Sequence, residues 1–142
     1  MSGTGVGPRR IAREVAFRVA YQADVAGDAY RVAWDLRRPE ETLDDDQIEL
    51  VEDLVRALDA RGAEVDGALR DAAQHWPLER LAATDRAVLR IAVAEMLARP
   101  GSPARVVLDE AIEIARRYGS EESGRFVNGV LDRAARTLRA AE

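Results

Sequence analysis

The chain has 142 residues, a net charge of −5 and no cysteine. This length suits one domain with a single sizeable core, and the lack of cysteine excludes a disulfide framework. Hydrophobic residues make up 47% and charged residues 33% of the sequence, as in ordinary globular proteins, and no apolar run is long enough to cross a bilayer. The first residues contain no apolar stretch of the kind that a secretory signal needs, so we expect a cytoplasmic protein.

Charge is distributed unevenly along the sequence. Residues 9–18 contain four arginines and one acid, whereas residues 40–53 contain eight acids and no base. Residues 125–139 again contain four arginines against one acid. Both ends are therefore basic and the segment near the middle is acidic. A negative net charge of this size does not exclude a local basic surface that binds nucleic acid.

The sequence pattern predicts helices along almost the whole chain. Residues 1–7 form a Gly/Ser/Thr-rich flexible lead, and residues 8–142 form one helical domain. Helices are expected from Pro8 to Ala26, over 29–36 before Pro39, over 45–60 after the cap Asp44, and from the Arg61-Gly62 break to His75. The Trp76-Pro77 turn, a helix capped by Thr84 that runs to Ala98, a helix from Pro103 to Gly119 and a last helix capped by Ser120 complete the order.

The segment 86–98, RAVLRIAVAEMLA, is apolar on nearly every side of a helix. Such a helix belongs at the centre of a bundle. No segment alternates between apolar and polar residues for long enough to form a convincing strand. We therefore expect an all-α fold, a compact bundle of about seven helices with short connections.

No arrangement of residues typical of an enzyme is apparent. The only histidine, His75, lies at a helix end, where a capping or surface role is most common. The acidic run Asp44-Asp45-Asp46 lacks the glycine and the terminal glutamate of a calcium loop, and its position favours a helix start. No glycine-rich phosphate loop is present. We expect no catalytic residue, no metal and no cofactor.

The first helix places arginines and aromatic residues together on one side. An aliphatic stripe runs from Ile11 to Ala23, and a second side holds Arg9, Arg10, Arg13, Phe17 and Tyr21. Arginines that contact phosphates, beside rings that stack on bases, are typical of proteins that bind single-stranded RNA. The alternative is that Phe17 and Tyr21 pack against a second layer of the bundle.

The last helix repeats this pattern within GSEESGRFVNGVLDRAAR, residues 119–136. Arg125 and three later arginines lie opposite the apolar stripe with Gly129 among them, and Phe126 lies at the border. A glycine inside a helix costs roughly 1 kcal/mol relative to alanine, so a second helix or a ligand is expected to approach closely. For Gly124 we favour helix packing, and for Gly129 an approaching RNA. The two basic faces can form one surface if the terminal helices are neighbours.

Three segments resemble the NusB family of transcription antitermination factors. They are RRIAREVAFRVAYQADVAG at 9–27, HWPLERLAATDRAVLRIAVAEML at 75–97, and ARVVLDEAIEIARRYGSEESGRFVNGVLDRAAR at 104–136. FVNGVLD is the most specific part, and the correspondence is weak only around 28–70. The resemblance implies two packed three-helix groups that bind the boxA element of ribosomal RNA leader transcripts. It also implies NusE, a ribosomal small-subunit protein, and the elongating RNA polymerase as partners, and in some members a homodimer.

The resemblance carries over residue by residue. Arg9, Arg10 and Arg13 match the family's basic motif, although Ile11 stands where some members have another arginine. Tyr21 matches an aromatic residue placed against RNA, and Arg125 and Phe126 also match. Glu122 stands where many members have aspartate, Gly124 where some have histidine, and Ala73 where some have a tyrosine near RNA. For NusE the resemblance points to the surface around Glu79 and Asp85.

Two other functions are compatible with these patterns. In the first, the chain is a helical protein–protein adaptor or homodimer whose basic helices do not bind RNA. In the second, it is the RNA-binding domain of a ribosomal RNA methyltransferase, which would require a further domain for the methyl donor. An RNA-binding antitermination factor without catalytic activity remains the leading interpretation.

Overall fold

The structure of this protein, a computed structural model, describes residues 7–140, so the expected lead at 1–7 lies almost wholly outside the described residues. Within that range the chain forms seven α-helices, two short 3-10 helices and no strand. The α-helices are α1 (Pro8–Ala26), α2 (Tyr30–Arg37), α3 (Asp45–Ala60), α4 (Gly62–Ala72), α5 (Ala83–Ala98), α6 (Ala104–Tyr118) and α7 (Glu121–Leu138). The 3-10 helices are η1 (Arg38–Glu40) and η2 (Leu78–Arg80). The predicted all-α fold of about seven helices is confirmed.

Local sequence signals explain most helix boundaries. Gly27 ends α1 in the left-handed region, with φ at 74°, which glycine adopts without steric cost. Asp44 accepts a hydrogen bond from the Gln47 backbone, and the Gln47 side chain accepts one from the Asp44 backbone, so α3 begins with a complete capping box. The Ser120 side chain accepts from the Ser123 backbone and caps α7.

Two predicted boundaries are wrong. Helix α4 ends at Ala72 and not at His75, because Arg133 of α7 donates to the Ala72 carbonyl at 2.6 Å and the following residues turn back toward η2. Thr84 does not cap α5, since the capping residue is Ala82, which has no side-chain hydrogen bond. At the end of α4, the contact with Arg133 is a tertiary one, which a local sequence signal does not report.

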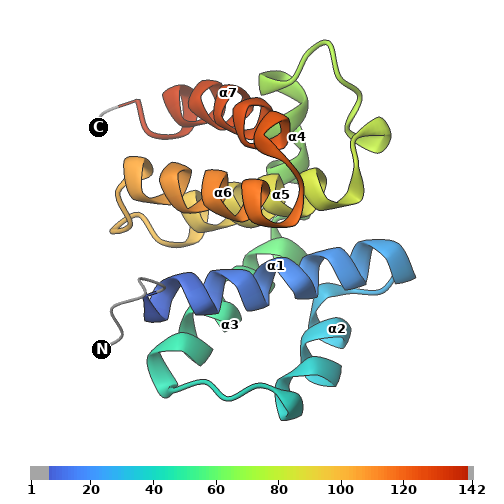
Figure 1. The fold of residues 1–142 in the computed structure, drawn as a ribbon, viewed down its shortest axis with the longest axis vertical. Coiled ribbons are helices and arrows are strands. Elements are labelled where there is room, and N and C mark those ends of the chain that lie inside the picture. Colours follow the sequence, from blue (N-terminus) through green and yellow to red (C-terminus); the bar gives the residue numbers. More distant parts are fainter. Residues whose placement is uncertain (1–6, 141–142) are drawn as a thin grey trace.

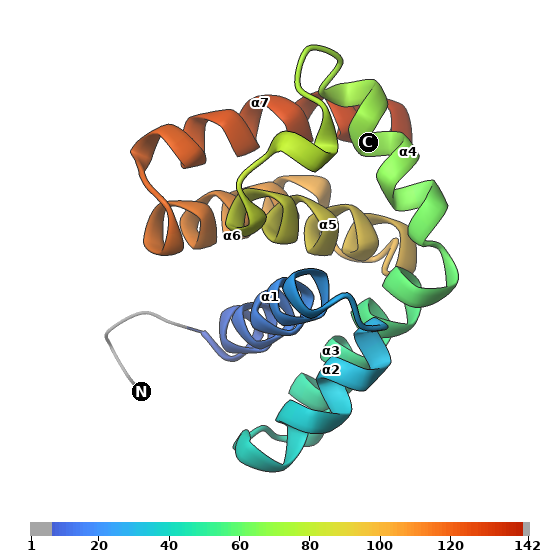
Figure 2. The same ribbon diagram turned by 90° about the vertical axis from the view of Figure 1, so that its right-hand side faces the viewer.

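The helices form two packed groups, α1–α3 and α4–α7 (Figure 1, Figure 2). Helix α5 contacts α1 and α3 of the first group and α4, α6 and α7 of its own. Both faces of α5 are therefore buried, which confirms the central position predicted from its all-round apolar sequence. In both views α5 and α6 form a layer between α1 and α7.

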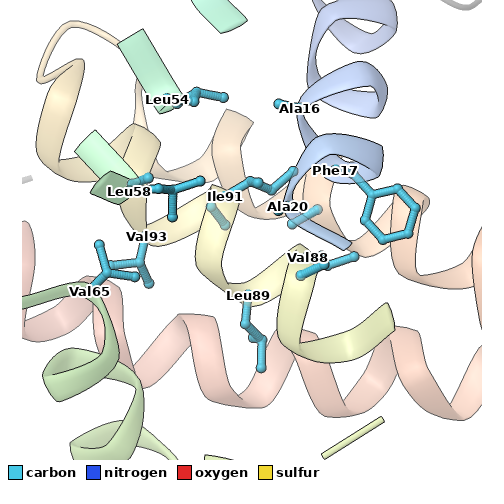
Figure 3. Close-up of a cluster of buried hydrophobic side chains, with 14 of the residues drawn as sticks. Ala16, Phe17, Ala20, Leu54, Leu58, Val65, Val88, Leu89, Ile91 and Val93 are labelled. Carbon is cyan, nitrogen blue, oxygen red and sulfur yellow. The ribbon is translucent and has the colours of Figure 1, made fainter. Parts of the chain in front are cut away.

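The core runs continuously through both groups. Figure 3 shows Ala16, Phe17 and Ala20 of α1 close to Val88 and Ile91 of α5. Alanines along α1 let its backbone approach α5 closely. None of the helices between residues 7 and 140 combines the length and the hydropathy that crossing a membrane requires.

Acidification should destabilise the fold. Hydrogen bonds from Arg10 lower the pKa of Glu110 below its ordinary value of 4.5, and those from Arg31 do the same for Glu52. A carboxylate whose pKa is lower in the folded state stabilises the protein above the unfolded pKa, and that stability is lost as the pH falls through the folded pKa. Urea midpoints should therefore be level between pH 7 and 5 and fall below about 4.5. The decrease should be shallower in Glu52→Gln, and an equally steep decrease in that variant would contradict this assignment.

Candidate nucleic-acid interface

The three arginines at the start of α1 have different environments. Arg9 is exposed, and its side chain makes no hydrogen bond or ion pair within the described part of the chain. Arg10 donates through Nε and Nη2 to both carboxylate oxygens of Glu110 in α6, at 2.7 and 2.8 Å. Because that pair leaves Nη1 of Arg10 unused, the guanidinium can still donate toward solvent.

Arg13 points into the protein. Its side chain is 5% exposed and donates through Nε and Nη2 to the carboxylate of Glu95, itself 2% exposed, at 2.8 and 2.7 Å. Glu110 lies 3.6 Å from the Nη1 atom of Arg13 and so joins the two pairs into one network. The network connects α1 to both α5 and α6. The predicted position of Arg13 on the open arginine side is therefore wrong, since its guanidinium is covered.

Phe17 and Tyr21 also separate from one another. Phe17 is 4% exposed and belongs to the core cluster in Figure 3, so its place among exposed RNA-binding residues is wrong and the alternative that it packs in the bundle is confirmed. Tyr21, one turn later, is 40% exposed. The Phe17 ring lies 6.5 Å from that of Tyr21 and 4.8 Å from that of Tyr118 at the end of α6. The buried Phe17 ring thus supports two partly exposed rings, those of Tyr21 and Tyr118.

Tyr118 is the centre of a polar cluster that the sequence reading missed. Its hydroxyl accepts from Arg18 at 2.6 Å and donates to Glu14 at 3.1 Å, and Arg117 donates to the other oxygen of Glu14 at 2.9 Å. The guanidinium carbons of Arg18 and Arg117 lie 5.6 and 5.9 Å from the Tyr118 ring centre. A sequence signal that could have identified Tyr118 is its position directly before Gly119, the residue that ends α6.

Tyr21 and Tyr118 line an apolar groove of about 510 Å³. Its walls are formed by the second half of α1, the end of α6 and residues of α2 and α5, among them Phe17, Arg18, Val25, Arg37 and Thr84. Aromatic walls with arginine at the edge suit a stacked base beside a phosphate.

The arginines of α7 divide into an open and an internal set. Arg125 is exposed at the start of the helix. Arg133 instead binds the end of α4, and Arg139 donates to the carbonyl of Met96 in the last turn of α5 and to those of Arg99 and Ser102 in the connection that follows. A cation beside these carbonyl groups also interacts favourably with the negative end of the helix dipole. Much of the basic face that the sequence suggested for α7 therefore holds the bundle together.

The two glycines of α7 have different surroundings. A methyl group added to Gly124 would meet Cγ of Arg116 at 2.8 Å, so this glycine allows α6 and α7 to pack closely. A methyl group at Gly129 would meet nothing within 4 Å. Gly129 is thus open to approach from outside, beside the exposed Asn128.

Phe126 meets a second aromatic residue, Trp76, in the turn between α4 and η2. The two rings meet edge to face, with centres 6.0 Å apart and planes at 83°. A groove of about 320 Å³ runs beside them, lined also by Arg80, Asp85, Ser120 and Glu122. Glu79 is exposed in η2, so Glu79, Asp85 and Glu122 lie in one region of the surface.

The terminal helices are not neighbours, because α5 and α6 lie between them (Figure 1, Figure 2). The first turn of α1 and the first turn of α7 lie toward opposite ends of that layer. The structure connects α1 to α6 through Tyr118, and the chain enters α7 three residues later, at Glu121. Open aromatic side chains thus occur on both sides of the α6–α7 junction. Among residues 7–140 no group of three or more acidic or histidine side chains could hold a metal ion.

The side chains of four of the 21 arginines make no hydrogen bond or ion pair in the described part of the chain. They are Arg9, Arg70, Arg80 and Arg125. Arg80 lines the groove beside the Trp76–Phe126 pair, and Arg125 directly precedes Phe126 in α7. An arginine without an internal partner keeps its donors for an external anion, and phosphate is the anion that its planar fork suits best.

An all-α bundle with exposed rings and unpaired arginines near the start of its last helix defines a helical nucleic-acid-binding protein. The comparisons with known proteins agree with this class. Residues 10–136 match the model of the NusB family, and the chain belongs to that family.

Curated relatives carry the same family name. The chain is 43% identical over 134 residues to the transcription antitermination protein NusB of Sorangium cellulosum (strain So ce56), covering 94% of this chain and 95% of that protein. It is 44% identical over 134 residues to the NusB of Anaeromyxobacter dehalogenans (strain 2CP-1 / ATCC BAA-258), covering 92% of each.

Solved structures of the family have the same fold. Superposition on T. maritima NusB gives a TM-score of 0.84 at 35% identity, covering 93% of each chain. A structure of antitermination factors NusB and NusE in complex with double-stranded RNA matches with a TM-score of 0.81 at 25% identity, covering 91% of this chain and 96% of that one.

Proposed function

We propose that this protein is an RNA-binding transcription antitermination factor that acts without catalysis. It binds boxA RNA of ribosomal RNA leader transcripts together with NusE, in the cytoplasm, and promotes read-through by the RNA polymerase elongation complex. Its family membership and the NusB–NusE–RNA complex of a relative support this function. The observation that carries it is the group of open rings and unpaired arginines around the α6–α7 junction.

The RNA contacts divide by exposure. Arg9 and Arg125 bind phosphates directly, and Arg10 does so through its unused Nη1 while Glu110 fixes its orientation. Tyr21 and Phe126 stack on bases, Glu122 accepts from a base edge, and Gly129 lets the backbone of α7 come near the RNA. Arg13 and Phe17 do not contact the RNA; they hold α1 in place through Glu95 of α5 and Tyr118 of α6.

NusE binds at the acidic surface around Glu79 and Asp85. Both residues lie near the Trp76 turn, and Asp85 lines its groove. A ribosomal protein has a basic surface to offer, and complementary charge promotes such an association. This placement brings protein partner and RNA to adjoining surfaces, so each can strengthen binding of the other.

Fluorescence anisotropy with labelled RNA tests this function. We expect weak binding of boxA RNA alone and tighter binding when NusE is present, with a preference over a scrambled sequence in the second case. Equal affinity for boxA and scrambled RNA under both conditions would contradict it. The titrations are compared at one fixed salt concentration because phosphate contacts make affinity depend on salt.

Removing one phosphate contact should change the salt dependence as well as the affinity. In Arg9→Ala we expect weaker binding of boxA and scrambled RNA alike, and a slope of log K against log salt that is smaller by about 1. Arg56→Ala is the matched control, since Arg56 is an exposed arginine on acidic α3. If both variants gave the wild-type slope, Arg9 would not contact phosphate.

One observation favours the alternative of an adaptor or homodimer. Val25, Val32 and Leu36 form exposed apolar side chains at the end of α1 and on α2. Burying them in an interface would be favourable. Molar mass measured by light scattering, with and without RNA, separates the two functions: a dimer that RNA neither binds nor dissociates supports the adaptor.

A further inference from the structure

We propose that Trp76 is an RNA-binding residue and that its indole stacks on one unpaired base of single-stranded RNA, with the nearly perpendicular Phe126 ring bordering that base. The inference rests on the proposed RNA-binding function and adds a residue and a defined ligand to it. The ligand class is a nucleobase, stacked on the indole of Trp76 and bordered by an aromatic ring from another part of the chain.

The two tryptophans of the chain show what is unusual about Trp76. Trp34 is fully buried, and its indole nitrogen donates to Glu52 at 2.8 Å. Trp76 is 57% exposed, and within residues 7–140 its indole nitrogen has no hydrogen-bond partner. Packing in the core thus accounts for Trp34, whereas the exposed ring of Trp76 contributes little to the core. Large exposed aromatic residues are typical of binding surfaces.

The turn holds Trp76 in a defined place. The Trp76 backbone N–H donates to the Ala73 carbonyl at 2.9 Å, and the Arg80 backbone N–H donates to the Pro77 carbonyl at the same distance. Leu78 is buried and anchors the turn in the core. The ring also contacts Phe126 of α7 edge to face. A ring that is already oriented loses little entropy when a base stacks on it.

The charges around the groove favour a base over a phosphate inside it. Asp85 and Glu122 line the groove and their carboxylates repel phosphate, and the Glu122 carboxylate can accept hydrogen bonds from the amino groups of a base. Arg80 lines the same groove, and Arg125 directly precedes Phe126 in α7. Both arginines are among the four without partners, so they remain available for the phosphates on either side of the stacked base.

Tryptophan fluorescence observes this contact directly, because Trp34 is shielded in the core. We expect a single-stranded RNA containing boxA to quench wild-type emission, and the same RNA in a perfect duplex to leave it unchanged, since paired bases are already stacked. Trp76→Phe retains only Trp34 and should show no quenching while it still binds RNA. Quenching that persists in Trp76→Phe would overturn the proposal.

Affinity gives a second measurement. Trp76→Ala should bind single-stranded boxA RNA about 5- to 150-fold more weakly, the usual range for losing one base–aromatic stack, and Trp76→Phe should recover part of this loss. Gln74→Ala changes an exposed side chain of the same turn and should bind like wild type. Circular dichroism confirms that each variant is folded.

The outcomes separate this proposal from the function on which it rests. If wild-type protein binds no RNA, the proposed function fails. If Trp76→Ala binds RNA like wild type and RNA leaves Trp76 emission unchanged, only the base site fails. Emission that responds to NusE and not to RNA would assign Trp76 to the protein partner and overturn the inference.

Discussion

Replacing Arg13 by alanine should lower the free energy of unfolding by about 3–5 kcal/mol, as is usual when one partner of a buried ion pair is removed. Glu95, which is 2% exposed, would then be a buried carboxylate without its bidentate partner. Urea denaturation measures the loss, provided that the m-value stays constant. A loss below about 1 kcal/mol, the usual worth of an exposed pair, would mean that Arg13 and Glu95 are far more solvated than described.

The double variant Arg13→Met with Glu95→Leu distinguishes a structural role of Arg13 in holding α1 from direct contact of Arg13 with RNA. Replacing both charges with apolar side chains of similar size is often neutral or stabilising, so this variant should regain most of the stability lost in Arg13→Ala. If Arg13 acts only by holding α1, the double variant should also bind boxA RNA like wild type. Weaker RNA binding by a stable double variant would return Arg13 to the RNA-contacting set.

Phe17 and Tyr21, one helical turn apart, should show opposite effects. Phe17→Ala should cost about 3–5 kcal/mol of stability because it removes a buried ring from the core. Tyr21→Ala should leave stability nearly unchanged and weaken RNA binding by about 1–3 kcal/mol through the loss of a stacked base. Thermal melts and RNA titrations of both variants measure the two effects.

A milder substitution keeps the comparison valid if Phe17→Ala fails to fold. Phe17→Leu retains most of the buried volume and should bind RNA like wild type. Strong loss of RNA binding in folded Phe17→Leu, with none in Tyr21→Ala, would reverse the assignment of the two rings.

The sequence was sufficient to predict the fold because its helix signals are local. The capping box at Asp44, the left-handed glycine at 27 and the cap Ser120 each act within one turn. The central place of α5 was also predictable, because an all-round apolar helix has to be buried. Of the two boundaries that failed, the end of α4 at Ala72 is bound by a distant residue, Arg133, and the start of α5 lies two residues before the expected cap Thr84.

The binding surface was predicted only in part, because some arginines of this chain bind internal partners and others are exposed. A helical wheel places Arg10, Arg13 and Arg133 on polar faces, but it does not show Glu110, Glu95 or the Ala72 carbonyl, which meet them in the fold. These partners lie 61 to 100 residues away in the sequence. The same limit explains why Tyr118 and Trp76 were missed, since each gains its significance from a ring elsewhere in the chain.

Hydrogen exchange with and without boxA RNA, in the presence of NusE, tests most directly whether RNA binds around the α6–α7 junction. We expect RNA to slow amide exchange in residues 117–129 and in the turn over 73–80, while α2 and the acidic start of α3 exchange as before. Comparison with the NusE complex alone separates the effect of RNA from that of the protein partner. Slowing confined to α2 and α3, or no slowing at any amide, would contradict the proposed RNA surface.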